Sequence, residues 1–219
     1  TLGILITGNE LESPGHALPY GKVYDSNSFT FKSAFQQIGI REISILKVTD
    51  QVALLIEALH GALDKHDVVI LTGGVSVGDF DFVIEATRHC GVQQVFHKIK
   101  QKPGKPFYFG VKEGKYVFGL PGNPASSLTC FYEYIEPAIQ KMMGKPSSIK
   151  IARAPITAEY DKPAGLTHFL KAYFDGSRVT PLDAQESFRL KSFARANALI
   201  AIDENTTSVS VGEEVEVHI

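Results

Sequence analysis

"DVVILTGGVSVGDFD", residues 67–81, is the stretch from which the fold can be worked out. Its first part is nearly all apolar, as is typical of a strand buried on both faces of a parallel sheet. Gly73 and Gly74 end that strand and Gly78 follows, so the backbone can turn sharply or pass close to a bound group. Apolar residues then recur at helical spacing over residues 82–90. The stretch therefore predicts a strand, a tight loop and a helix.

The same alternation of strand and helix extends over residues 1–146. Apolar runs predict strands at 2–7, 41–48 and 67–72 and a hairpin around 112–115, and helical spacing predicts helices at 26–38, after Asp50, at 80–90 and at 123–144. Pro137 should kink the last helix, because it frees the carbonyl four residues earlier. The alternation predicts an α/β domain of three layers, in which helices cover both faces of a mostly parallel sheet.

The pattern changes after "GKPSS", and residues 147–219 hold short alternating segments separated by turn residues. These segments are "IKIARAPIT", "THFLKAYF", "RVTPL", "NALIAID" and "EEVEVHI". Such a pattern predicts a small β-domain of about 70 residues. We therefore expect two domains, at residues 1–146 and 147–219.

Bulk composition argues against several classes of protein. A net charge of -2 disfavours nucleic-acid binding driven by overall charge. No apolar run has membrane-spanning length and no signal peptide is recognisable, so we expect no membrane partner. Cys90 and Cys130 stand far apart, as buried thiols of a reducing, cytoplasmic compartment do. The chain opens within an apolar strand and without Met, so we expect it to be part of a longer protein.

Gly-rich segments follow the strands at 2–7, 67–72 and 116–120. Open α/β sheets bind ligands at the carboxyl ends of their strands, so these segments should share one rim. The glycines after residue 72 either hold an anion through backbone N–H groups or simply make a tight turn. Asp79 suits a helix cap, whereas Asp81 should lie beside the rim as a free acid.

Three further stretches supply charge to this rim. "HKIKQKPGKPFYFG" carries Lys98, Lys100, Lys102 and Lys105, which form either a solvated face or a set of held cations. "GLPGNPASS" opens a helix at which Asn123 can cap and Ser126 and Ser127 can bind an anion. The acids Glu10 and Asp50 follow the first two strands, although Asp50 also suits a plain helix cap. Carboxylates beside a phosphate site make sense where a divalent cation lies between them or one of them activates water.

The segments "TGNEL…YDSNS", "TGGVSVGDFD", "KPGKPF" and "GLPGNPASS" occur in the order and spacing of the molybdopterin molybdenumtransferases, the MoeA family that includes the E domain of gephyrin. "SFARANALIAI" resembles the final β-domain of that family. The resemblance covers essentially the whole chain. It implies a MogA-like three-layer domain followed by a small β-barrel-like C-terminal domain, without the family's two N-terminal domains.

The resemblance implies an enzyme of molybdenum cofactor biosynthesis. Such an enzyme takes adenylated molybdopterin and molybdate as substrates, cleaves the pyrophosphate link, releases AMP and inserts molybdenum into the dithiolene, assisted by Mg²⁺. Carried over by motif position, the catalytic residues are Glu10, Asp50 and Asp81, of which Asp50 and Asp81 would also bind the metal. The substrate-binding positions are Thr7, Gly8, Asp25, Asn27, Gly73, Gly74, Val75, Ser76, Gly78, Lys98, Lys102, Lys105, Pro106, Pro121, Gly122, Asn123, Ser126, Lys171 and Ser187.

This sequence departs from the family where Gly-Arg-x-x-Phe-x-Arg is expected. Here "GLTHFLK" places Leu166 and Lys171 at the arginine positions, with His168 and Arg189 as possible replacements. The resemblance further implies a cytoplasmic homodimer and a MogA-type adenylyltransferase partner. Two other functions stay open: a MogA-like adenylyltransferase, which would be a single domain, and a non-catalytic scaffold of the gephyrin type.

Overall fold

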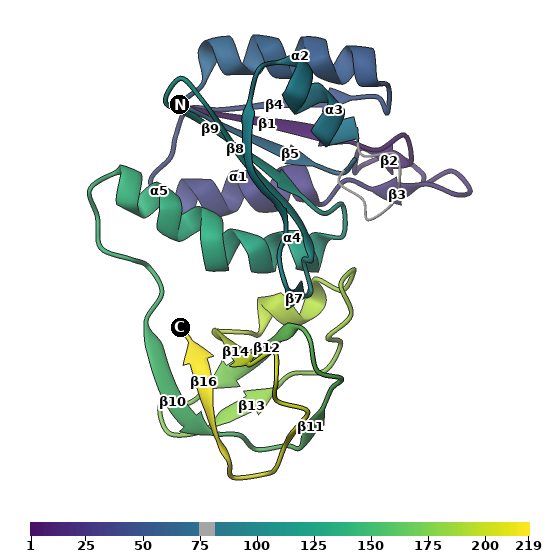
Figure 1. Cartoon of the computed structure of the whole chain (residues 1–219). Coiled ribbons are helices and arrows are strands. Elements are labelled where there is room, and N and C mark those ends of the chain that lie inside the picture. Colours follow the sequence, from purple (N-terminus) through teal and green to yellow (C-terminus); the bar gives the residue numbers. More distant parts are fainter. Residues whose placement is uncertain (75–81) are drawn as a thin grey trace. The chain divides into compact units, whose positions relative to one another are not determined.

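The computed structural model describes residues 1–74 and 82–219, and the chain forms two compact units (Figure 1). The first unit comprises Thr1–Ile99 and Pro106–Leu128, and the second comprises Lys100–Lys105 and Thr129–Ile219. The site positions that lie outside the described residues are Val75, Ser76, Gly78, Asp79 and Asp81.

The described residues of the first unit form a six-stranded sheet in the order β4-β1-β5-β9-β8-β6. These strands are β1 (Leu2–Thr7), β4 (Ile43–Val48), β5 (Val68–Thr72), β6 (Gln93–Lys98), β8 (Pro106–Lys112) and β9 (Lys115–Leu120). Neighbours from β4 to β9 pair in parallel, and β8 runs antiparallel to both β9 and β6. The predicted mostly parallel sheet and the hairpin at 112–115 are confirmed.

Helices cover both faces of this sheet (Figure 1). They are α1 (Asn27–Gln37), α2 (Val52–Lys65), α3 (Phe82–His89) and the start of α4 (Pro124–Cys130). On one face, α2 and α3 bury Leu59 and Val83 against strand residues such as Leu5 and Leu71 in one apolar cluster. Ile4 points to the opposite face and is equally buried, because alternate strand residues face opposite sides. The three predicted layers are confirmed.

The Gly/Pro-rich segment after β1 contains a short parallel pair, β2 (Leu11–Glu12) and β3 (Val23–Tyr24). Its apolar residues are largely exposed, and Tyr20 is fully so. The pair brings the chain back to the start of α1, which begins at the same edge of the sheet where β1 ends. The loop therefore spans the rim that was predicted from sequence.

The second unit is built mainly of strands. Its described residues form an antiparallel sheet in the order β10-β16-β14-β12-β13, with β7 paired to β12 and a separate pair β11-β15. The strands are β7 (Gln101–Lys102), β10 (Ile151–Pro155), β11 (Tyr160–Asp161), β12 (Thr167–Phe174), β13 (Val179–Pro181), β14 (Ala198–Ile202), β15 (Ser208–Val209) and β16 (Glu214–His218). Each alternating segment predicted in the C-terminal region contains one of these strands.

The core of this sheet is formed by small and β-branched side chains, among them Ile156, Val179, Ile200 and Val217. The outer strands β10 and β13 approach each other through a single parallel bridge between Ile156 and Val179. Among the described residues no ladder of hydrogen bonds joins β10 to β13, so the sheet is not a closed barrel. The C-terminal domain of strands is thus confirmed, and its closure is limited to that bridge.

The long helix predicted for residues 123–144 is interrupted in its middle. After α4 the helix widens into a π-helical segment, η1 (Phe131–Ile135), and then continues as α5 (Glu136–Met142). Pro137 explains the change, because it lacks an N–H and its ring displaces the carbonyl of residue 133. The N–H of Glu136 instead reaches the carbonyl of Phe131, five residues back. The proline therefore acts by inserting a π turn.

His218 near the C-terminus is held between two carboxylates of the second unit. Its Nδ1 lies 2.7 Å from Glu133 Oε2 and its Nε2 lies 2.9 Å from Glu216 Oε1, so both ring nitrogens act as donors. Burial alone would lower the pKa of His218, but the hydrogen bonds and charges of Glu133 and Glu216 outweigh it and raise that pKa to about 9. His218 is therefore an imidazolium at neutral pH.

We predict that the second unit loses stability as pH rises from 6.5, the ordinary pKa of histidine, to about 9. A group whose pKa is raised in the folded state stabilises the fold fully at pH values below its unfolded-state pKa. This stabilisation is lost as the pH rises through its folded-state pKa. The free energy of unfolding should fall by on the order of 2 kcal/mol over that window. Chemical denaturation at a series of pH values measures it. In His218→Gln the dependence should flatten, and equal slopes for both proteins would contradict the assignment.

Candidate functional site

The carboxyl ends of the parallel strands form one edge of the first unit's sheet. Thr7 ends β1 opposite Val48 of β4, and Thr72 ends β5 opposite Leu120 of β9. The chain passes from β1 outward to β4 and then returns beyond β1 to β5, so the winding reverses between β1 and β5. Ligands of open α/β sheets bind outside the carboxyl ends at such a reversal. The candidate site is therefore this edge.

Gly73 and Gly74 meet Thr7 at the point of reversal. A Cβ on Gly73 would lie 2.2 Å from the carbonyl oxygen of Thr7, and one on Gly74 would lie 3.1 Å from Thr7 Oγ1. The φ angles of the two glycines are 83° and 65°, values that other residues adopt only under strain. Packing of β1 against this loop therefore requires both glycines, whether or not an anion also binds there.

The hydroxyl of Thr7 is an unused polar group at the same edge. Thr7 is only 4% exposed, and its Oγ1 makes no hydrogen bond within the part of the chain that the structure describes. A buried polar group without a partner costs about 1–3 kcal/mol. Gly8 follows directly with a φ of 147°, and a Cβ there would meet the Glu10 carboxylate at 2.9 Å. A bound polar group at this edge would satisfy Thr7.

Asp25 is fixed at the start of α1 by three groups. It is 1% exposed, and its Oδ1 accepts the N–H of Ser28 at 3.0 Å. Its Oδ2 accepts the hydroxyl of Ser28 and lies 3.2 Å from Lys47 Nζ. Asp25 thus caps the first turn of α1, and its charge is balanced by Lys47. Its oxygens are occupied by the protein itself, which makes it a residue that shapes the edge.

Asn27 ties together three segments of the edge. Its Nδ2 donates to Thr72 Oγ1 at 2.8 Å and to the carbonyl of Gly122 at 3.0 Å. These acceptors end β5 and follow β9, whereas Asn27 itself begins α1. The amide therefore holds the loop after β9 against the end of β5.

Asp50 and Asn9 bracket the loops that follow β1 and β4. The N–H of Asn9 donates to Asp50 Oδ2 at 2.9 Å, and the N–H of Asp50 donates to Asn9 Oδ1 at 3.2 Å. The N-cap of α2 is Gln51, so Asp50 is not the plain helix cap that was one of its two interpretations. Asp50 is partly exposed, and its Oδ1 accepts no hydrogen bond from the described residues. Glu10 lies next to Asn9 and is exposed.

The "PGNPASS" segment after β9 presents backbone more than side chains. Gly122 and Asn123 are exposed, while Pro121 and Ser126 are buried. Ser127 is fully buried and its hydroxyl donates to the carbonyls of Pro121 and Asn123. Ser127 therefore closes the turn instead of facing a ligand.

Lys98 and Pro106 lie at the same edge, at the far end of the sheet. They pair across β6 and β8, and β6 runs parallel to β9 because both are antiparallel to β8. The carboxyl end of β6 therefore shares the edge with Thr7 and Thr72. Lys98 is exposed there.

Lys102 and Lys105 belong to the second unit. Lys102 lies on β7 opposite His168 of β12, and both lysines are exposed. The neighbouring Lys100 instead pairs with Glu204 at 3.4 Å. The predicted set of four held cations is thus divided, since Lys100 is engaged in an ion pair and the other three lysines are exposed.

Lys171 is enclosed by its own unit. It is 2% exposed, and its Nζ donates to the carbonyls of Ala184 at 2.6 Å and Arg189 at 3.0 Å. Burial, above all, lowers the pKa of its amine. Lys171 therefore anchors the loop on which Ser187 lies, and two of its three N–H donors are already in use.

His168 does not supply the positive charge that the missing arginine would carry. Its Nδ1 shares a hydrogen bond of 2.7 Å with Tyr160 Oη, and it is 3% exposed. Burial and then the charges of Lys102 and Lys162 lower the pKa of His168 to about 4. The imidazole is therefore neutral at physiological pH. Arg189 pairs with Glu186 at 3.4 Å on the surface.

A divalent cation was expected between Asp50 and Asp81, and Asp81 lies outside the described residues. Over residues 1–74 and 82–219, no group of three or more His, Cys, Asp or Glu side chains is arranged to hold a metal. Mg²⁺ is commonly bound through one or two carboxylates together with substrate phosphates. Asp50 Oδ1, which accepts no hydrogen bond from the described residues, could serve as one such carboxylate ligand.

Two family models match this chain in succession. Residues 3–141 match the probable molybdopterin binding domain, and residues 153–219 match the MoeA C-terminal region, domain IV. This chain belongs to the molybdopterin-binding domain family. The edge that carries Thr7, Asp50 and Gly73 thus lies within the stretch matched by that family's model.

Known proteins of this family extend the likeness to the whole chain. This chain is 35% identical to the molybdopterin molybdenumtransferase of Staphylococcus epidermidis and 34% identical to that of Haemophilus influenzae, in each case over 99% of this chain's length. A crystal structure of the molybdopterin biosynthesis MoeA protein from Pyrococcus horikoshii superposes on all of it, with a TM-score of 0.85 and 30% identity. The chain spans only 53–55% of the two curated relatives and 54% of the crystallised protein.

Sequence reasoning missed two residues of this molybdopterin-binding domain edge, Asn9 and Lys47. Asn9 lies inside "TGNE", next to the predicted site residue Glu10. Its amide oxygen and its backbone N–H form hydrogen bonds with Asp50. Lys47 interrupts the apolar run "ISILKV" near the end of β4, and that interruption was a signal for a buried anionic partner. Both contact residues more than twenty positions away in the sequence, so their roles could be recognised only from the folded structure.

We predict that Asn27→Asp destabilises the first unit by roughly 2–3 kcal/mol, because a carboxylate would face the Gly122 carbonyl with no proton to donate. Urea denaturation measures the loss. Gln37→Glu is the control, since it makes the same amide-to-acid change on an exposed position of the same helix. It should cost well under 1 kcal/mol. Equal losses in the two variants would show that Asn27 does not tie the edge together.

Proposed function

We propose that this chain is the substrate-binding and catalytic half of a molybdopterin molybdenumtransferase. Its substrates are adenylated molybdopterin and molybdate, and its products are AMP and molybdenum cofactor. The observation that carries the proposal is the carboxyl edge at β1 and β5. There, a buried hydroxyl and one carboxylate oxygen that have no hydrogen-bond partner among the described residues lie beside two glycine-rich turns. The match of the molybdopterin-binding domain model over residues 3–141 supports it.

The proposed reaction has two parts. Water attacks the pyrophosphate link, one P–O bond breaks, and AMP leaves while the phosphate monoester of molybdopterin remains. The two dithiolene sulfurs bond to molybdenum, while their two protons and one molybdate oxygen leave as water. No redox change is needed in either part.

Each group at the edge has a role in this proposal. Backbone N–H groups after Thr72 and Leu120 bind the phosphates, and Thr7 hydrogen-bonds the substrate. Asp50, with Glu10 and Asp81, orients the attacking water and accepts its proton. Asp50 and Asp81 would hold Mg²⁺, which when bound offsets the charge of the phosphates. Lys98 attracts molybdate as a point charge, and the resemblance implies the same role for Lys102 and Lys105 of the second unit.

A MogA-like adenylyltransferase is a weaker proposal, because the second unit carries the MoeA C-terminal match. A scaffold role of the gephyrin type gains support from the apolar Leu166, just before β12, and the enclosed Lys171 on β12, because neither offers a free charge to molybdate. We further propose a cytoplasmic homodimer that receives its substrate from a MogA-type adenylyltransferase. In the described part of the chain, no helix has the length and apolar character to span a bilayer.

We predict that Asp50→Asn slows AMP release by roughly 10²–10⁴-fold, because the edge would lose its partly free carboxylate. AMP release from adenylated molybdopterin is measured chromatographically on the full-length protein. Asp64→Asn is the matched control, since Asp64 lies on the exposed surface of α2. A wild-type rate for Asp50→Asn, beside an unchanged control, would favour the scaffold function.

We predict that Lys102→Ala raises the KM for molybdate about tenfold while the thermal midpoint stays within a degree or two, since its amine is solvent-exposed. Lys100→Ala removes the neighbouring lysine, whose amine pairs with Glu204, and should leave KM unchanged. Molybdate-dependent cofactor formation gives both values. Equal effects of the two substitutions would mean that only the summed charge of the segment matters.

A further inference from the structure

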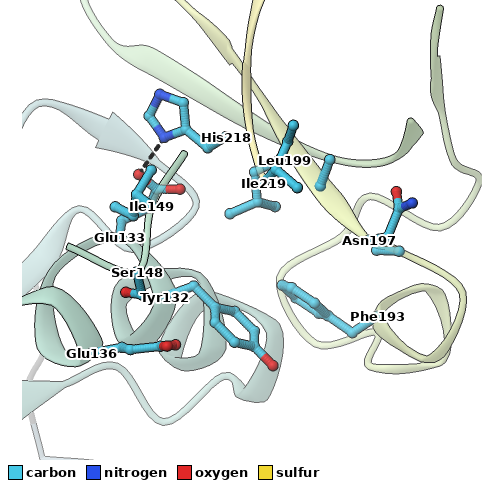
Figure 2. Close-up of a pocket in the computed structure, with 12 residues that line it drawn as sticks. Tyr132, Glu133, Glu136, Ser148, Ile149, Phe193, Asn197, Leu199, His218 and Ile219 are labelled. Carbon is cyan, nitrogen blue, oxygen red and sulfur yellow. Dashed lines mark hydrogen bonds and ion pairs between the residues drawn. The ribbon is translucent and has the colours of Figure 1, made fainter. Parts of the chain in front are cut away.

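The second unit contains a cavity of about 310 Å³ that shares no residue with the candidate site (Figure 2). Its walls come from η1, α5, the linker before β10, the loop before β14 and the C-terminal end of β16. A volume of this size is at the lower end of small-molecule sites. The cavity therefore suits a compact ligand.

The middle of the cavity is apolar. Figure 2 shows the rings of Tyr132 and Phe193 on facing walls, with Ile219 and Leu199 nearby. The two ring centroids are 6.2 Å apart and tilted by 34°. One face of Phe193 already contacts a cation, because Lys171 Nζ lies 5.6 Å from its centroid. Tyr132 is 36% exposed, so part of its side chain is accessible to a ligand.

Charge in the cavity is unevenly balanced. The carboxylates of Glu133 and Glu216 are paired with His218, so those charges are engaged within the protein. Glu136 has no lysine, arginine or histidine within ion-pair distance in the described part of the chain, and it is partly buried. Burial raises the pKa of Glu136. Burial, above all, and then the charge of Glu136 raise the pKa of Tyr132, one helical turn away. Glu136 and Tyr132 therefore border the same space.

We propose that this cavity binds a compact organic cation, with its ammonium group at Glu136 and its apolar or aromatic body against the wall formed by Tyr132, Phe193 and Ile219. An anion would meet an uncompensated carboxylate. A neutral apolar ligand would bury that carboxylate further without a partner, which is costly. An ammonium ion instead gains a charge-assisted hydrogen bond and a contact with the Tyr132 ring. The proposal does not depend on the function assigned to the first unit.

The test uses two probes of nearly equal shape, phenethylamine and 2-phenylethanol. At neutral pH the first is an ammonium ion and the second is neutral. Calorimetric titration of the unaltered chain gives both dissociation constants. We expect the amine to bind about tenfold more tightly than the alcohol. Equal affinities, or no binding of the amine at millimolar concentration, would overturn the proposal without any variant being made.

Variants then locate the binding. Glu136→Gln keeps the size of the side chain and removes the charge, so the preference for the amine should disappear. Glu159→Gln removes an exposed charge of the same unit and should leave the preference intact. Retention of the preference in Glu136→Gln, or its loss in Glu159→Gln, would place the amine outside this cavity.

Discussion

The backbone of Gly73 passes so close to the carbonyl of Thr7 that a single added carbon would lie 2.2 Å from it. This contact lets β5 end directly beside β1, at the point where the winding of the sheet reverses. Open α/β sheets bind ligands outside the carboxyl ends of their strands at such a reversal. The close approach of the Gly73 backbone to Thr7 therefore lies where a ligand is expected.

Hydrogen bonds between distant segments hold the edge in shape. Asn27 joins the start of α1 to the ends of β5 and β9, while Asp25 caps the same helix and is balanced by Lys47. Thr7 Oγ1 and Asp50 Oδ1 accept no hydrogen bond from the residues that the structure describes, so they are candidates for contact with a ligand. The division separates residues that build the edge from residues available for chemistry.

The strands and the three layers were predictable because the apolar runs are long and the Gly-rich turns are unambiguous. The same was true of the rim, since the carboxyl ends of parallel strands must meet. The role of Lys171 was not predictable, because its amine is occupied by carbonyls of residues 184 and 189, whose proximity depends on tertiary packing. The hydrogen bonds between Asn9 and Asp50, and the single bridge between β10 and β13, could not be predicted for the same reason. The roles expected of Val75, Ser76, Gly78 and Asp81 remain predictions.

Because β7 belongs to the second unit, no single cut in the chain separates the two units. Residues 100–105 leave the first unit, pair with β12 and return before the chain crosses again after Leu128. A gene fragment that encodes only the C-terminal strands would lack this pairing and expose an edge of β12, and such edges promote aggregation. The two matched regions follow each other along the sequence, but residues 100–105 of the first region belong to the second unit, so a cut between the two matches would divide that unit.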